Sequence, residues 1–90
     1  MTTARRVIVS GRVQGVFFRA WTKEQADQLG AAGWARNCAD GSVEVHLEGS
    51  DEPVEEIIRR LRTGPSHARV DDLKLEETVP EGLREFEIRH

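Results

Sequence analysis

Two hydrophobic periods alternate along the chain and predict its secondary structure. A β-branched run over residues 6–13 predicts a first strand, and strict alternation of apolar and polar residues over 42–48 predicts a half-buried strand. Residues 20–29 carry a thin helical stripe that ends at Gly30, a residue suited to a helix C-cap. Residues 51–63 form the clearest element, because their apolar residues recur at i, i+3, i+4 and i+7, the spacing of one helix face.

The strand at 42–48 is predicted to form a hairpin with a strand at 33–38, across a turn that contains an Asp-Gly pair. A two-residue loop would place Arg36 on the buried face of the sheet. A three-residue loop ending in a left-handed glycine instead pairs Arg36 with Glu44 on the outer face. We favour the second register because it forms a cross-strand ion pair and keeps charge out of the core. It also places Asn37 on the inward face.

The C-terminal third predicts two further strands. Residues 67–78 change parity at Asp71-Asp72, which indicates a β-bulge, and Phe86 and Ile88 alternate with charged residues in a short final strand. The order strand, helix, strand, strand, helix, strand predicts an α+β, ferredoxin-like split βαβ fold. We expect one domain over residues 1–90, with a four- to five-stranded antiparallel sheet and both helices on one face. This fold hosts many functions and decides nothing about chemistry.

Composition narrows the functional classes. The 90 residues are 38% hydrophobic and 32% charged, as is ordinary for a soluble globular protein. No apolar run approaches a membrane span and no secretory signal is evident, so we expect a cytoplasmic protein without a membrane partner. The net charge of −3 argues against a nucleic-acid partner. We expect a monomer.

The metal-ligating residue types are scattered. His46, His67 and His90 lack metal-ligand spacing with one another or with the single cysteine, Cys38, so we expect neither a metal nor a cofactor. Cys38 has no histidine fixed beside it, which argues against a catalytic thiol. His46 is expected to face solvent from its strand.

The candidate site is the stretch from residue 11 to residue 19. It passes from strand to helix through a loop that contains Gly15, and such a junction points free N–H groups and the positive end of the helix dipole at one spot. Arg19 falls at the start of the predicted helix, where the dipole disfavours a cation unless an anion joins it, and its fork matches phosphate. A solvated arginine in a first turn is an equally good interpretation. The P-loop signature is absent, so nucleotide binding is not implied.

Asn37 is the second candidate. Asparagine is depleted in strands, and an inward amide needs hydrogen-bond partners. A structural asparagine that ties the hairpin or turn is the slightly favoured interpretation, and Asn37 gains weight only as a partner for the anion loop. Together these residues offer an arginine, amides and no nucleophile or general acid. They suit a leaving group that departs without help, such as the carboxylate of a mixed carboxylic–phosphoric anhydride, and not an alkyl phosphate ester.

Two stretches form motifs: residues 11–19 read Gly-Arg-Val-Gln-Gly-Val-Phe-Phe-Arg, and residues 33–44 read Gly-Trp-Ala-Arg-Asn-Cys-Ala-Asp-Gly-Ser-Val-Glu. Together these two motifs resemble the acylphosphatase family. Weaker matches are Gly64-Pro65 and the closing Phe-Glu-Ile-Arg run. Ala35 replaces a larger aliphatic residue that is usual in the second motif.

The resemblance implies hydrolysis of small-molecule acyl phosphates to a carboxylate and inorganic phosphate, without metal or cofactor. It implies that Arg19 binds phosphate and acts in catalysis and that Asn37 orients the attacking water. The implied phosphate cradle is formed by Gln14, Gly15, Val16, Phe17, Phe18 and Arg19. Two alternatives are a non-catalytic phosphate- or anion-binding module and an accessory domain of a carbamoyl-phosphate-handling assembly.

Overall fold

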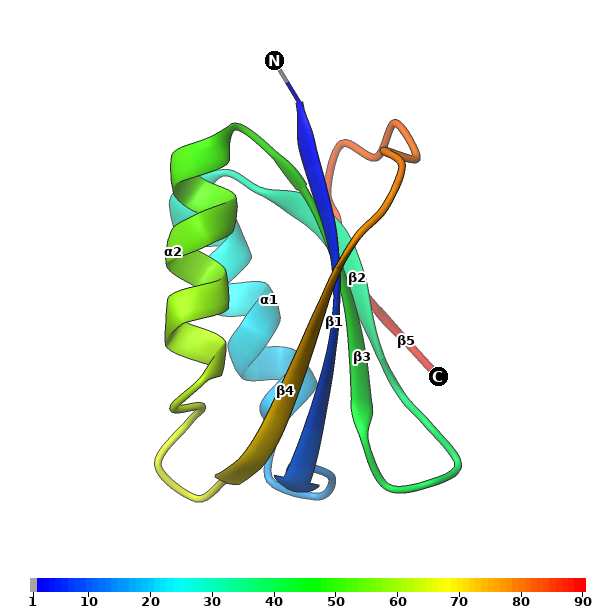
Figure 1. Cartoon of the computed structure of the whole chain (residues 1–90). Coiled ribbons are helices and arrows are strands. Elements are labelled where there is room, and N and C mark those ends of the chain that lie inside the picture. The colour runs from blue at the N-terminus through cyan, green and yellow to red at the C-terminus, as the bar shows by residue number, and fades with distance from the viewer. Residues whose placement is uncertain (1) are drawn as a thin grey trace.

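The computed structural model describes residues 2–90, so Met1, which the predicted domain includes, lies outside the described residues. Figure 1 shows the helices packed against a sheet. The elements, in chain order, are β1 (Thr3–Arg12), α1 (Phe18–Leu29), β2 (Ala32–Asn37), β3 (Val43–Gly49), α2 (Asp51–Leu61), β4 (Arg69–Glu77) and β5 (Phe86–Arg89). The predicted element order is confirmed, and α1 begins two residues earlier than the apolar stripe indicates.

The sheet has five strands in the order β4-β1-β3-β2-β5. The pairs β1–β3, β1–β4 and β2–β3 are antiparallel, as predicted, whereas β5 runs parallel to β2 and makes the sheet mixed. The parallel pair follows from the topology. Because the chain crosses from β4 to the opposite edge and reverses once, β5 runs opposite to β4 and therefore in the direction of β2.

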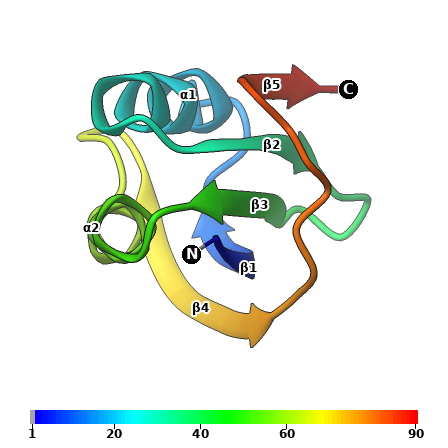
Figure 2. The same ribbon diagram turned by 90° about the horizontal axis from the view of Figure 1, so that it is seen from above.

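Both helices cover the same face of the sheet, as predicted, and Figure 2 shows them together on one side of the curved strands. The core lies between the two layers. Its side chains come from the inward positions of the strands and from the apolar stripe of α2: Val7, Val9, Val43, Val45, Leu47, Val54, Ile57, Ile58 and Leu61. Burial of this surface at roughly 25 cal/mol per Å² is the main force that holds α2 on the sheet.

The predicted bulge lies where the parity changes. Ser10 pairs with Asp72 and Gly11 with Val70, so Asp71 is the extra residue on β4. The chains approach closely here: a Cβ on Gly11 (φ 127°) would lie 2.2 Å from the backbone oxygen of Arg69. The bulge therefore requires glycine at position 11, close to the end of β1 and just before the candidate loop.

The outer face of the sheet corrects one prediction. His46 was expected to face solvent, but it is 2% exposed. The segment between β4 and β5 crosses this face, and the backbone amides of Glu81 and Leu83 donate to the Glu48 carboxylate over 2.7 and 2.6 Å. His46 Nε2 lies 2.6 Å from the same carboxylate and its ring stacks on Trp34. Alternation correctly identified the outward face of β3; it carried no information about what covers that face.

Candidate active site

The loop between β1 and α1 presents unpaired backbone amides. It occupies residues 13–17, at the lower end of the sheet in Figure 1. Gly15 (φ 75°) and Phe17 (φ 60°) both adopt left-handed conformations. In the part of the chain that the structure describes, the amides of residues 14–18 donate no backbone hydrogen bond to any turn or loop. Alternating right- and left-handed residues turn successive N–H groups toward a common point, which is the geometry of an anion-binding nest.

The first turn of α1 is anchored in the core while its polar end stays open. Phe18 is 2% exposed and packs against Trp21, with ring centroids 5.7 Å apart. Thr22 is fully buried and its hydroxyl donates to the Phe18 carbonyl over 2.8 Å. The first turn contains no acidic residue and no side chain caps it. The partial positive charge of this helix terminus is therefore not neutralised by the helix itself.

Arg19 extends from this turn toward the C-terminal strand. Its Nη1 donates to the backbone oxygen of Arg89 over 2.7 Å and lies 3.4 Å from Nδ1 of His90. The ion pairs among residues 2–90 engage Arg6, Arg36, Arg59, Arg60, Arg69 and Arg89, and not Arg19. The side chain is thus held in place by groups that leave its positive charge available for an external anion.

Asn37 lies at the end of β2, close to the same corner. The predicted hairpin register is confirmed: Arg36 pairs with Glu44, and Asn37 pairs with Val43. On the other side of β2, Arg36 lies opposite Arg89 in β5. Since the backbone of Arg89 holds Arg19, the β2–β5 pair brings Asn37 and Arg19 to one corner of the sheet.

The hairpin turn beside Asn37 is fixed by other residues. The Asp40 carboxylate accepts hydrogen bonds from the backbone amide and the hydroxyl of Ser42, over 3.0 and 2.6 Å. These hydrogen bonds, the hydroxyl's first, lower the pKa of Asp40 below its ordinary value. The side chain of Asn37, in contrast, is exposed to solvent. The turn therefore has its own ties, and the Asn37 amide is free to contact a water or ligand.

Gln14 joins the two halves of the site. Its side-chain amide donates to the backbone oxygens of Cys38 and Ser42, over 2.8 and 2.9 Å. The loop at residues 13–17 is thereby tied to both ends of the turn that follows Asn37. This role could not be derived from sequence, because it depends on two carbonyls that only the tertiary structure brings to the loop.

A pocket of about 570 Å³ gathers the predicted groups. It is lined by Val13, Gly15, Phe17, Phe18, Arg19, Ala20, Asn37, Ile88 and His90. Arg19, Asn37 and three of the cradle residues thus share one cavity, whereas Val16 and the side chain of Gln14 lie outside its lining. Ile88 and His90 were missed by sequence analysis, since only the parallel pairing of β5 brings them here.

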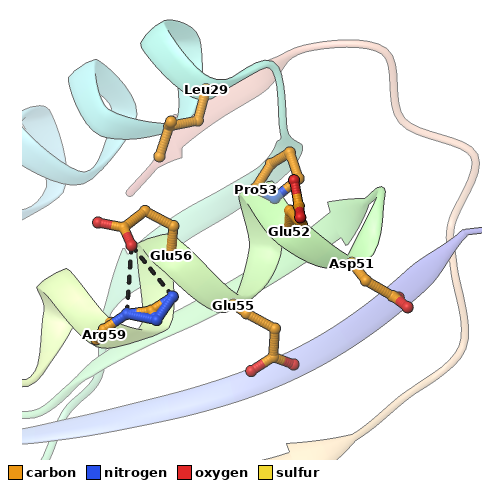
Figure 3. Close-up of a pocket in the computed structure, with 7 residues that line it drawn as sticks. All are labelled: Leu29, Asp51, Glu52, Pro53, Glu55, Glu56 and Arg59. Atoms are coloured by element: carbon orange, nitrogen blue, oxygen red, sulfur yellow. Dashed lines mark hydrogen bonds and ion pairs between the residues drawn. The ribbon is translucent and has the colours of Figure 1, made fainter.

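A second hollow, of about 470 Å³, lies between the end of α1 and the outer side of α2 (Figure 3). Leu29 lines it from α1, and the acidic first turn of α2 lines it from the other side. Its only cation among the lining residues, Arg59, pairs with Glu56 at 3.1 Å. It has neither an available cation nor an amide cradle, so we assign the candidate chemistry to the pocket at Arg19.

Two further properties concern residues 2–90 as a whole. No helix in this part of the chain has the length and apolar character needed to cross a membrane. No group of three or more histidine, cysteine, aspartate or glutamate side chains in the same range is arranged to hold a metal ion.

Comparison with known proteins identifies the family. The acylphosphatase family model matches residues 5–88. An acylphosphatase of Rubrobacter xylanophilus is 52% identical over 85 residues, covering 93% of this chain and 77% of that protein. One of Rhizorhabdus wittichii is 56% identical over 75 residues, covering 83% of this chain and 76% of its own. The crystal structure of acylphosphatase from Bacillus subtilis superposes with a TM-score of 0.94 at 35% identity, over the whole of both chains.

The chain belongs to the acylphosphatase family, and it is an enzyme of that class. The family resemblance and the ferredoxin-like fold expected from the sequence are confirmed. The alternative of an accessory domain is not favoured, because the curated relatives at about 50% identity over most of the chain are named acylphosphatases.

Proposed function

We propose that this protein hydrolyses acyl phosphates by holding the phosphoryl group between Arg19 and the backbone amides of residues 14–18, while Asn37 orients the attacking water. The observation that carries the proposal is the shared pocket of Arg19 and Asn37 beside amides that make no other backbone hydrogen bond. Family membership supports the choice of acyl phosphates as the substrate class.

The chemistry asks for positioning and charge stabilisation more than for a nucleophile. In phosphoryl transfer, negative charge spreads over the oxygens of the transferring group, and preorganised donors stabilise it. The water oxygen forms a bond to phosphorus as the bond between phosphorus and the bridging oxygen breaks. A dianionic acyl phosphate and water thus yield a carboxylate and dihydrogen phosphate, with both water protons retained on phosphate.

Arg19 and Asn37 have separate roles in this scheme. Arg19 contacts the phosphoryl oxygens in the ground state and more strongly in the transition state. Asn37 contacts the water, and the proton passes from that water to a phosphate oxygen of the substrate. No side-chain base and no metal are required, because a carboxylate is a good leaving group.

The direct test is hydrolysis of benzoyl phosphate with a chelator present. We expect rapid turnover by the wild type and no turnover of phenyl phosphate, a simple ester. Arg19→Ala is expected to lower kcat/KM by about 10²–10³, the typical effect of losing one preorganised donor. Asn37→Ala is expected to lower kcat while inorganic phosphate still binds.

Three results would contradict the proposal or one of its parts. If the folded wild type binds phosphate without turnover, the non-catalytic anion-binding module replaces it. If chelator abolishes activity and added metal restores it, the metal-free scheme fails. A rate profile whose bell shape is assigned by mutation to one side-chain base would contradict the proton route.

We also propose that residues 1–90 act as a single monomeric domain in the cytoplasm, without a nucleic-acid partner. One sheet and one core include all seven described elements, and the family model spans residues 5–88. Light scattering after size-exclusion chromatography tests the monomer: a mass of 10.1 kDa is expected, and twice that mass would contradict it.

A further inference from the structure

Two adjacent phenylalanines have opposite environments in the active-site loop. Phe18 is 2% exposed and belongs to the core, whereas Phe17 is 84% exposed. The left-handed backbone at Phe17 (φ 60°) separates their directions. That backbone region favours glycine and asparagine and is unfavourable for a bulky side chain. Phe17 therefore stands where both solvation and backbone conformation favour a smaller or polar residue.

A single exposed apolar side chain is common on protein surfaces and carries no functional meaning by itself. Val79, 77% exposed in the connection between β4 and β5, is such a case. Phe17 differs from Val79 because it lines the pocket that contains Arg19 and Asn37. Local rules of solvation and backbone conformation are broken together most often at functional sites.

An acyl phosphate substrate would explain why the apolar side chain of Phe17 lies at this place. In an acyl phosphate, the acyl substituent begins three covalent bonds from phosphorus, so side chains that share a pocket with the phosphoryl group are within its reach. The same pocket is lined by the apolar residues Val13, Ala20 and Ile88. Beside Arg19, the pocket therefore offers apolar surface at the place that a substituent three bonds from phosphorus would reach.

We propose that the phenyl ring of Phe17 contacts the acyl substituent of the substrate, so that the enzyme favours acyl phosphates with an aromatic or bulky apolar acyl group over acetyl phosphate. This inference rests on the proposed function and adds a specificity residue to it. Contact between the two apolar surfaces removes both from water, and ring against ring adds an aromatic interaction.

The test compares kcat/KM for benzoyl phosphate with kcat/KM for acetyl phosphate. The ratio is taken relative to the wild type, so the intrinsic reactivity of the two substrates cancels. Phe17→Asn removes the ring and suits the left-handed backbone, whereas Phe17→Tyr keeps the ring. Val79→Asn is the matched control for loss of an exposed apolar side chain elsewhere.

We expect the benzoyl-to-acetyl ratio to fall about three- to tenfold in Phe17→Asn, the range of one aromatic contact. The ratio should stay close to the wild-type value in Phe17→Tyr and in Val79→Asn. If Phe17→Asn lowers both rates by the same factor, the ring is only part of the cradle and the inference is wrong. Absence of turnover of either substrate by the wild type would instead refute the proposed function, so the two failures are distinguishable.

Discussion

Arg19 and Arg36 lie close to the same corner of the sheet but have different electrostatic environments. Arg36 contacts Glu44 at 2.6 Å, and Arg6 pairs with the same carboxylate from the neighbouring strand. Arg19 contacts a backbone oxygen and an imidazole nitrogen instead. The charge of Arg36 is paired within the fold, whereas that of Arg19 has no carboxylate partner among residues 2–90. The comparison separates an arginine that is paired within the sheet from one that we propose serves the reaction.

The two helix starts repeat this contrast. Helix α2 begins with Asp51 and Glu52 and ends with Arg59 and Arg60, which complements the helix dipole at both ends. Helix α1 has neither an acidic first turn nor a basic last turn. The positive end of α1 is thus left open beside Arg19. We infer that charge complementarity marks the structural elements of this protein and that its absence marks the active site.

The largest effect is expected from removing each of the two arginines in turn. Arg19→Ala should lower kcat/KM by about 10²–10³ with the fold intact, because it removes a donor made for the transition state. Arg36→Ala should keep kcat/KM near the wild-type value and lower the unfolding midpoint. Benzoyl phosphate kinetics and urea denaturation of both variants measure this. Equal losses of activity in the two variants would break the comparison.

Gln14 sharpens the comparison because it tests the position of the loop at residues 13–17 and not the charge of the site. Gln14→Met keeps the length of the side chain and removes both donors to the hairpin turn. We expect kcat to fall about ten- to a hundredfold, since small misplacements of reacting groups have effects of this size. Gln25→Met, on the side of α1 that faces α2, where the half-buried Gln25 accepts from Arg60, is the control and should retain kcat. A wild-type kcat in Gln14→Met would show that the tie has no catalytic role.

Glu44 tests the structural side of the comparison, which is the ion pairing of Arg36 within the sheet. Its side chain is 6% exposed and lies between Arg6 and Arg36. Burial raises the pKa of Glu44, but the hydrogen bonds and charges of the two arginines lower it further, so its pKa in the folded protein is below the ordinary value. Glu44→Gln should reduce the free energy of unfolding by about 1–3 kcal/mol, because it removes a charged acceptor from a buried site.

The ion pairs of Glu44 with its two arginines also predict how the stability of the protein responds to acid. Because the folded pKa of Glu44 is depressed, its stabilisation is fully present above the unfolded value near 4.5 and is lost as the pH falls through the folded pKa. Urea midpoints of the wild type and Glu44→Gln should therefore differ at neutral pH and converge in acid. A difference that grows as the pH falls would contradict the sign of the shift.

The smallest effect is expected at the start of α2. Glu52→Gln removes one charge that favours the helix dipole and should reduce the free energy of unfolding by about 0.3–1 kcal/mol in low salt. Its kcat should match the wild type, since the residue lies outside the pocket at Arg19. Loss of activity without loss of stability would mean that the hollow of Figure 3 contributes to catalysis.

The sequence predicted those features that depend on local pattern. The register that pairs Arg36 with Glu44 followed from turn chemistry and from keeping charge out of the core, and the bulge at Asp71 followed from a change of parity. The burial of His46 could not be predicted, because the segment that covers it has no periodicity of its own. The contacts of Gln14 and Arg19 are with backbone oxygens, which no residue type reveals.

The central claim is that Arg19 anchors the phosphoryl group. Its most direct test is calorimetric titration of inorganic phosphate into the wild type, Arg19→Ala and Arg36→Ala. We expect the wild type and Arg36→Ala to bind phosphate with the same Kd and Arg19→Ala to show no binding in the same range. Phosphate binding to Arg19→Ala with the wild-type Kd would contradict the claim.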